Sequence, residues 1–343
     1  MNNSHEHNRV ASAADVQGFY DLSAGRDDAQ FKHLLIGEKE AMLAMAVTMA
    51  TGRNLALVGE PAIGKTTIGQ DAGRIIDGLD KLTIIPERAD LKVSQLLGGE
   101  VQQVRVIDAG TPKERREVNR YETKPILTPD TQMIWSDEFN HLQPTLTNSL
   151  SEALEARRFK NPEGSIALNG LEYVVVAQNP GKINNGQFKV KPSVATRFGV
   201  GVIMGIDQDP QKRRDRIGKI GYDDWKPQPQ KMQAVTDLEE LHAIRNFING
   251  NNIVRPESLR NTFIDRVDAT EKVLREYGLG ESTNRIALQV GANAKAIAAF
   301  WGEPSLTPES IDQAVRFVVG ARIGMLSVNA VQDYPEAVNK ILS

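Results

Sequence analysis

Short apolar runs divide the first 205 residues. The five runs are 55–58, 82–85, 133–135, 173–177 and 200–204. Each is continuous and rich in β-branched residues, which is typical of strands buried on both faces of a parallel sheet. The stretches between the runs show helical spacing of apolar residues, most clearly over 144–159, where Leu146, Leu150 and Leu154 share one side. The alternation of strand and helix patterns predicts a doubly wound α/β core.

The pattern changes after Met204. Residues 206–234 are polar and carry several prolines, which indicates a linker or surface insertion. Residues 235–343 show no strand pattern and predict an all-helical domain of four or five helices. The expected N-caps are Thr236, Ser282 or Thr283, and Thr307. We therefore expect a loosely ordered extension over 1–34, an α/β core over 35–205, the linker over 206–234 and the helical domain over 235–343.

Composition narrows the class of protein. The 343 residues are 40% hydrophobic and carry a net charge of −3. A charge this small creates no overall electrostatic field that would favour binding to nucleic acid or to a membrane. Two basic clusters, 112–120 and 211–216, also contain acids and are interpreted as solvated loop or helix faces. Cysteine is absent, which excludes disulfides and thiolate chemistry. With no secretory signal and no run long enough to cross a bilayer, the sequence predicts a soluble, cytoplasmic protein without membrane insertion.

The stretch GEPAIGKT fits the phosphate-binding pattern G-x-x-x-x-G-K-[ST], between a predicted strand and a predicted helix. Glycines let the backbone approach the phosphates, Lys65 reaches the β- and γ-phosphates, and the Thr66 hydroxyl binds Mg²⁺. The alternative is a chance match at a glycine-rich turn. The predicted cofactors are ATP and Mg²⁺. The predicted cofactor-binding residues are Gly59, Glu60, Pro61, Ala62, Ile63, Gly64, Lys65, Thr66 and Thr67.

Polar residues follow the later strands. Asp137 and Glu138 come directly after 133–135, so Asp137 is a predicted Mg²⁺ ligand with Thr66, and Glu138 is a predicted base for the attacking water. Asn179 ends an apolar strand and can bond the water or the γ-phosphate. Arg197 precedes the last strand, where an arginine can reach a neighbouring subunit's nucleotide. The alternatives are an exposed acidic turn for the acid pair, an Asn-Pro-Gly turn for Asn179, and a plain surface or salt-bridge arginine for Arg197.

In this order the motifs resemble those of AAA+ ATPases, and the chain is most similar to the MoxR family, which is related to the magnesium chelatase ATPase subunits. The family-like stretches are 89–102, 137–159 and 278–302. The resemblance implies that Arg197 acts in trans and that Arg285 contacts the γ-phosphate of its own subunit; an ordinary surface arginine is the alternative for Arg285. The chain has His141 where the family commonly has arginine. Arg157 and Arg158 are candidates for intersubunit contacts.

The resemblance implies Mg-dependent ATP hydrolysis in a homo-oligomeric, hexameric ring. Hydrolysis would drive chaperone-like remodelling, maturation or assembly of a protein client, with a von Willebrand factor A-domain protein as a possible partner. Two alternatives stay open: a nucleic-acid motor or loader, and an ATP-locked scaffold with little hydrolysis. The acidic net charge and the lack of a basic stripe interleaved with aromatic residues count against nucleic acid. The intact acid pair, Asp137 and Glu138, counts against the scaffold.

Overall fold

The structure is a computed structural model. It describes residues 9–35, 38–86, 91, 95–96, 98–107, 115–161, 164–180, 188–205, 214, 219, 225–279 and 282–343.

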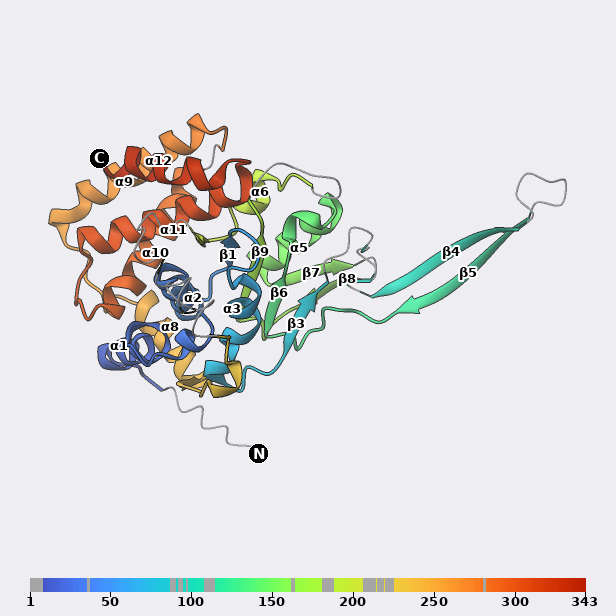
Figure 1. The fold of residues 1–343 in the computed structure, drawn as a ribbon, viewed down its shortest axis with the longest axis horizontal. Coiled ribbons are helices and arrows are strands. Elements are labelled where there is room, and N and C mark those ends of the chain that lie inside the picture. The colour runs from blue at the N-terminus through green and yellow to red at the C-terminus, as the bar shows by residue number, and fades with distance from the viewer. Residues whose placement is uncertain are drawn as a thin grey trace.

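A five-stranded parallel sheet forms the centre of the core (Figure 1). In chain order its strands are β1 (Leu55–Val58), β3 (Leu82–Ile85), β6 (Met133–Ser136), β9 (Tyr173–Gln178) and β10 (Val200–Ile203). The spatial order is β10-β1-β9-β6-β3, with every neighbouring pair parallel. The predicted α/β sheet is confirmed. Burial on both faces holds for four strands, but β3 lies at the edge and leaves Ile84 48% exposed.

Helices cover both faces of this sheet. They are α2 (Lys39–Thr51), α3 (Lys65–Asp71, extended by a 3-10 turn, Ala72–Ile75), α5 (Pro144–Ala156) and the short α6 (Pro192–Ala195). Side chains alternate across β1, so Leu55 and Leu57 join the core beneath α2, whereas Ala56 joins the core beneath α5. Helix α2 is buried all round from Ala41 to Ala50 and ends at Gly52, whose φ of 63° closes the last turn.

Five helices form the C-terminal region. They are α8 (Leu238–Asn249), α9 (Arg260–Glu276, preceded by a 3-10 turn, Glu257–Leu259), α10 (Thr283–Phe300), α11 (Pro308–Leu326) and α12 (Ala330–Leu342). Thr307 caps α11 in a reciprocal pair with Ser310, as predicted, whereas the α8 cap is Asp237 and not Thr236. Helix α11 packs on β10 so closely that a Cβ on Gly201 would lie 2.2 Å from the backbone of Ala321. The helical region and the sheet therefore share one core.

The N-terminal segment differs from the prediction. Residues 9–34 contain α1 (Ala13–Tyr20), a π-helical turn (Asp21–Gly25) and a 3-10 turn (Gln30–His33). Val16, Phe19 and Phe31 are buried, and Tyr20 stacks on Phe300 of α10 with ring centroids 4.9 Å apart. The expectation of a loosely ordered extension is wrong for these residues, because their spaced apolar side chains complete the helical core.

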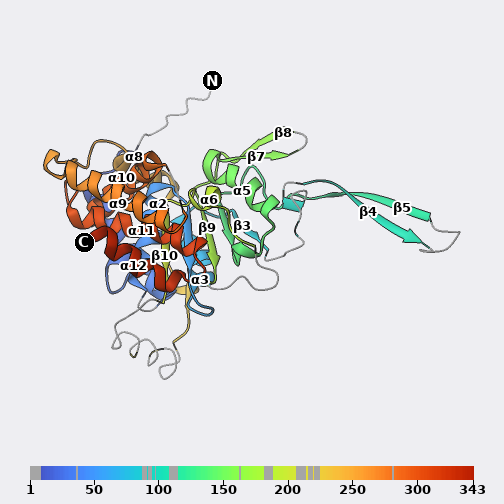
Figure 2. The ribbon, with the colours of Figure 1, turned by 90° about the horizontal axis from the view of Figure 1, so that it is seen from above.

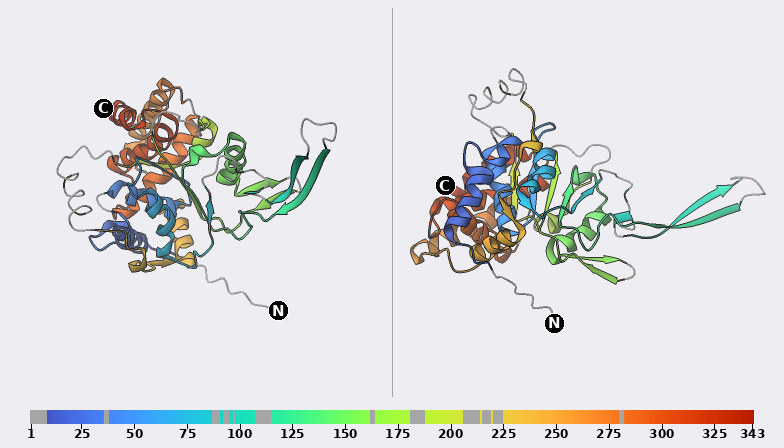
Figure 3. Two further views of the ribbon diagram at one scale, coloured as in Figure 1. Left: turned by 45° about the vertical axis from the view of Figure 1, so that its right-hand side comes forward. Right: turned by 90° about the horizontal axis from the view of Figure 1, so that it is seen from below.

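Two antiparallel hairpins were not predicted. The longer hairpin pairs β4 (Gly99–Ile107) with β5 (Arg115–Thr123) and projects far from the body of the protein (Figures 1, 2 and 3). The shorter one pairs β7 (Arg158–Asn161) with β8 (Gly164–Ala167). Residues 115–120 of the first basic cluster lie on β5, not on a loop or helix. Apart from Arg214, the cluster 211–216 lies outside the described residues.

A two-residue parallel pairing ties the chain together near the start of the helical region. It joins β2 (Ile76–Asp77) to β11 (Thr236–Asp237). The predicted linker ends in a 3-10 turn, Pro229–Lys231, and Gln228 donates its backbone N–H to the carbonyl of His33. Within the described parts of the chain, no helix combines the length and apolar character needed to cross a bilayer.

Candidate functional site

The loop 59–64 connects β1 to α3 and places Lys65 at the carboxyl edge of the sheet. Gly64 has φ 98° and precedes Lys65, a backbone conformation that favours glycine. Ala62 also has a positive φ, 62°. The Lys65 Nζ donates to the carbonyls of Gly59 (2.6 Å) and Glu60 (2.8 Å), so the loop wraps around its own lysine.

Three neighbouring strands bring the other predicted residues to the same edge. Because β1, β9 and β6 are adjacent and parallel, the residues that follow them meet. Lys65 Nζ donates to Asn179 Oδ1 (2.9 Å), and Asn179 Nδ2 donates to Glu138 Oε1 (2.5 Å). Thr66 Oγ1 donates to Asp137 Oδ2 (2.6 Å), and the Glu138 backbone N–H donates to Asp137 Oδ1 (3.0 Å). Five residues predicted separately from the sequence form one hydrogen-bonded cluster.

The cluster carries two physical signs of a functional site. Lys65 is only 5% exposed, and its burial lowers the pKa of its amine, an effect opposed by the charges of Glu138, Asp137 and Glu60. Glu138 adopts a left-handed backbone conformation, φ 44° and ψ 50°. A non-glycine residue in this region costs about 1–3 kcal/mol, and such strain is concentrated at active sites. The turn that follows Glu138, Phe139–His141, leads into α5.

The oxygen atoms of the cluster fit a magnesium nucleotide. Thr66 Oγ1 and Asp137 Oδ2 are 2.6 Å apart and are both hard oxygen ligands. Mg²⁺ is usually bound by one or two such groups together with substrate phosphates. Among the described residues there is no group of three His, Cys, Asp or Glu side chains that could hold a metal. The glycine-bounded loop and Lys65 are the matching elements for the phosphates.

The two predicted arginines lie elsewhere. Arg197 precedes β10, which runs parallel to β1, so it lies at the amino edge of the sheet, opposite Lys65. Glu155 at the end of α5 binds both arginines: its Oε2 lies 2.9 Å from Arg197 and its Oε1 accepts from Arg285 at 2.8 Å. Arg285 also donates to Thr196 Oγ1 (2.9 Å). The structure thus brings Arg197 and Arg285 together and does not place Arg285 beside the phosphate-binding loop of its own subunit.

Buried polar side chains of the helical region hold the backbone on either side of Arg197. Arg322 of α11, which is 0% exposed, donates to the carbonyls of Phe198 (2.5 Å) and Thr196 (3.3 Å) and bonds the Gln289 side chain. Gln289 Nε2 donates to the Thr196 carbonyl at 3.0 Å. One turn further along α10, Asn293 Nδ2 donates to the carbonyl of Gly199 at 2.8 Å, which completes the set. The position of Arg197 is therefore fixed from α10 and α11.

Sequence reasoning missed these supporting residues. Gln289 and Asn293 are four residues apart on an otherwise apolar stretch of α10, and this polar pair on a buried face is the signal that could have found them. Of the two candidates for intersubunit contacts, Arg158 is exposed, whereas Arg157 turns inward and donates to Asn54 Oδ1 (3.1 Å) and the Gly52 carbonyl (2.7 Å). Burial lowers the pKa of Arg157 to about 10. These bonds hold the turn between α2 and β1 within the subunit, so of the two candidates only Arg158 has its side chain on the surface.

Comparison with known proteins agrees with this architecture. No family model matches the chain. It is 21% identical over 325 residues to Chaperone MoxR1 of Mycobacterium tuberculosis, which covers 91% of this chain and 79% of that protein. Its fold matches the crystal structure of a protein from Cytophaga hutchinsonii assigned as an ATPase, with a TM-score of 0.65 and 20% identity over 96% of this chain and 94% of the other. The chain is therefore similar in sequence to a MoxR chaperone and similar in fold to an ATPase of known structure.

A more distant likeness concerns the fold alone. The MoxR-like chain also matches a full-length MCM homologue from Methanopyrus kandleri, with a TM-score of 0.50 and 15% identity, over 93% of this chain and 63% of that one. The likeness to these solved structures confirms the predicted core and helical region. The roles of the site residues rest on their geometry.

Proposed function

We propose that this MoxR-like protein is a Mg²⁺-dependent ATPase whose active sites form between the subunits of a ring. The observation that carries the proposal is the separation of two sets of residues. Lys65, Thr66, Asp137, Glu138 and Asn179 form a cluster at one edge of the sheet, whereas the arginines lie at the other. A subunit arranged in this way supplies the phosphate-binding half of one site and the arginine half of another.

Within the first set each residue has a role that its contacts support. Lys65 and the loop 59–64 hold the phosphates, and Thr66 with Asp137 holds Mg²⁺, which neutralises charge developing on the phosphates. Glu138 takes the proton of the attacking water, and Asn179, which bonds both Lys65 and Glu138, orients that carboxylate. The position of Asn179 between the cation and the base favours hydrolysis over storage of the nucleotide.

Both arginines act on the nucleotide of the neighbouring subunit in this proposal. Arg285 shares Glu155 with Arg197, so an interface that presents one arginine presents the other. This replaces the sequence-based expectation that Arg285 acts within its own subunit. A heterologous interface of this kind, in which unlike surfaces meet, generates a ring when the rotation between neighbouring subunits closes. An arginine supplied across such an interface is worth about 10³–10⁵ in rate.

The ring is expected to be a hexamer that remodels, matures or assembles a protein client, with a von Willebrand factor A-domain protein as a possible partner. The support is the similarity to a protein named as a chaperone and the agreement in fold. The β4–β5 hairpin, which projects from the body, is the element we assign to client contact (Figure 2).

The test of the shared site mixes two inactive variants. Lys65→Ala removes the phosphate-binding half and Arg197→Ala removes the arginine half, so each alone should lose ATP turnover. In an equal mixture about a quarter of the interfaces combine an intact half from each variant, and turnover should return in proportion.

The control mixes Lys65→Ala with Glu138→Gln. Both substitutions damage the phosphate-binding half, so every interface in this mixture lacks either the lysine or the base, and turnover should stay low. Mass photometry shows whether mixed rings form in each case. Mixed rings of Lys65→Ala and Arg197→Ala that remain inactive would contradict the shared site.

A further inference from the structure

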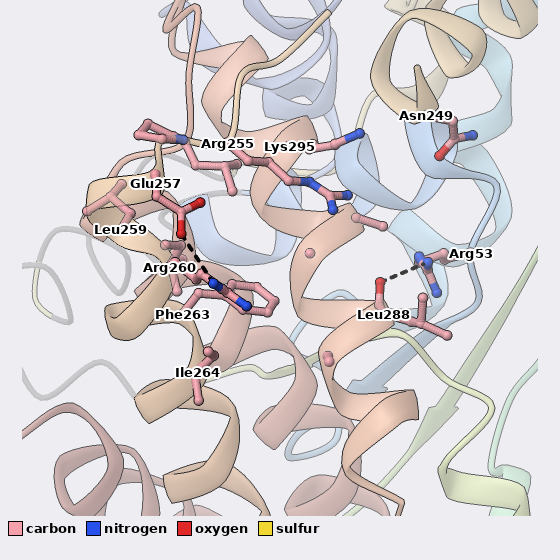
Figure 4. A pocket seen from close by; sticks show the side chains of 16 residues that line it. Arg53, Asn249, Arg255, Glu257, Leu259, Arg260, Phe263, Ile264, Leu288 and Lys295 are labelled. Carbon is pink, nitrogen blue, oxygen red and sulfur yellow. Dashed lines mark hydrogen bonds and ion pairs between the residues drawn. The ribbon is translucent and has the colours of Figure 1, made fainter. Parts of the chain in front are cut away.

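A cavity of about 590 Å³ lies at the side of the helical region, away from the phosphate-binding loop. It opens to solvent and is lined by the start of α9, the middle of α10, the segment that follows α8 and the turn between α2 and β1 (Figure 4). Its volume is within the range of small-molecule sites, about 300–1,000 Å³. None of the residues assigned above to ATP hydrolysis lines it.

The charged residues of the cavity are predominantly basic. Arg53, Arg255, Arg260 and Lys295 line it with a single acid, Glu257. That acid pairs with Arg260 at the rim, with both side chains largely exposed. Among the described residues, none of the ion pairs involves Arg53, Arg255 or Lys295. Three cations therefore face one cavity without a carboxylate partner in the described structure.

Two of these cations are held in a way that disfavours their charge. Lys295 is 5% exposed, and burial together with the nearby Arg255 lowers the pKa of its amine; its Nζ donates to the Gly250 carbonyl at 2.6 Å. Burial also lowers the pKa of Arg53, which donates to the Leu288 carbonyl at 3.3 Å and has a buried Nε without a hydrogen-bond partner. Figure 4 shows Arg255 and Lys295 projecting toward the same space, with Arg53 across from them. An anion placed there would relieve the repulsion between the cations.

The remaining lining is apolar. Phe263 and Leu259 come from the α9 side, and Leu288 from α10 is 70% exposed. Gly291 leaves the wall open, since a Cβ there would meet only the Phe263 ring, at 3.7 Å. A ligand for this site needs an anionic head for the cations and an apolar or aromatic body for these side chains. Two guanidinium groups and an ammonium group match a phosphate monoester, which carries about −1.5 to −2 charges, better than a monocarboxylate.

From this arrangement we infer that the cavity between α9 and α10 is a second binding site, specific for a small phosphate monoester with an apolar or aromatic body. Arg255, Lys295 and Arg53 bind the phosphate. Phe263, Leu259 and Leu288 contact the body of the ligand. The site is distinct from the one that binds ATP.

The test uses full-length chains carrying Lys65→Ala, so that phosphate compounds do not bind at the ATP site. Isothermal titration calorimetry with phenyl phosphate should show saturable binding. Inorganic phosphate and benzyl alcohol should each bind with lower affinity, because each lacks one half of the ligand. Adding Arg255→Gln, an exposed position that leaves the fold intact, should weaken phenyl phosphate about tenfold or more. Adding Gly291→Leu should block the cavity without changing its charge.

The matched control is Arg275→Gln, at the exposed end of α9, which removes the same charge away from the cavity and should leave the affinity unchanged. Circular dichroism checks the fold of each variant. Absence of saturable phenyl phosphate binding would overturn the inference. An affinity unchanged from that of the Lys65→Ala parent in the Arg255→Gln chain or in the Gly291→Leu chain would also overturn it.

Discussion

Replacing Arg322 by methionine tests whether the helical region positions the trans-acting arginine. The substitution keeps a side chain of similar length and its aliphatic part, but removes the guanidinium of a residue that is 0% exposed. The Phe198 carbonyl and the Gln289 side-chain oxygen then lose this donor, whereas the Thr196 carbonyl keeps its bond from Gln289. Each buried acceptor left unsatisfied costs about 1–3 kcal/mol, so the variant should lose about 2–6 kcal/mol of unfolding free energy.

The catalytic consequence follows from the same contacts. Arg197 lies between the two carbonyls that Arg322 holds, so releasing them lets the arginine shift. A displacement of about 1 Å in a catalytic group can cost about 100-fold in rate. We expect kcat for ATP to fall by this order while KM stays nearly constant, because the phosphate-binding cluster lies at the opposite edge of the sheet. Mixing Arg322→Met with Arg197→Ala chains should not restore turnover, because both variants lack the arginine half of the site.

The control separates positioning from loss of stability. Ile297→Ala truncates a fully buried residue of α10, one turn beyond Asn293, and should cost about 2–5 kcal/mol without touching the 196–199 backbone. Chemical denaturation gives the two free energies, and steady-state ATPase assays below the unfolding transition give kcat and KM. The reasoning is refuted if Arg322→Met keeps the native kcat, or if Ile297→Ala lowers kcat to the same extent.

Three further outcomes are expected. Gly69→Ala should lower the unfolding free energy by about 1–3 kcal/mol, because its Cβ would lie 1.9 Å from the buried ring of Trp135. Gly291→Ala, whose Cβ meets no atom closer than 3.7 Å, should be neutral or stabilising; thermal unfolding measures both variants, and equal effects would contradict the packing. Replacing 99–123 by a short Gly-Ser linker should change Tm by less than about 2 °C, since the hairpin projects from the body and its ends pair in register; loss of the folded state would contradict this. Burial lowers the pKa of Lys65 in the nucleotide-free protein, so between that pKa and about 10.4 the unfolded chain binds more protons than the native chain. The unfolding free energy of the native chain should therefore rise, relative to that of Lys65→Met, as pH rises through this window. Denaturation at a series of pH values measures this slope, and a slope of the opposite sign would show that the pKa is raised.

The sheet and the residues at its carboxyl edge could be predicted from the order of residues alone. Continuous apolar runs predicted five strands, and parallel neighbours with polar residues after them must bring those residues together, so Lys65, Asp137 and Asn179 could be grouped from the order of residues alone. The N-terminal segment could not be predicted in this way, because its few apolar residues, Val16 and Phe19 among them, are stabilised only by the helices they pack on. The local pattern of apolar residues does not show which helices will pack against them.

The placement of the arginines and the contacts that hold them follow from the packing of whole elements, not from the order of residues. Arg285 and Glu155 are 130 residues apart, and no spacing in the chain indicates that one carboxylate binds Arg285 and Arg197 together. The same is true of Arg322, whose partners come from other elements. The spacing of apolar residues shows which face of a helix or strand is buried, because that spacing is a property of the element itself. Pairing among distant polar side chains depends on how whole elements pack, and that is fixed only when the chain has folded.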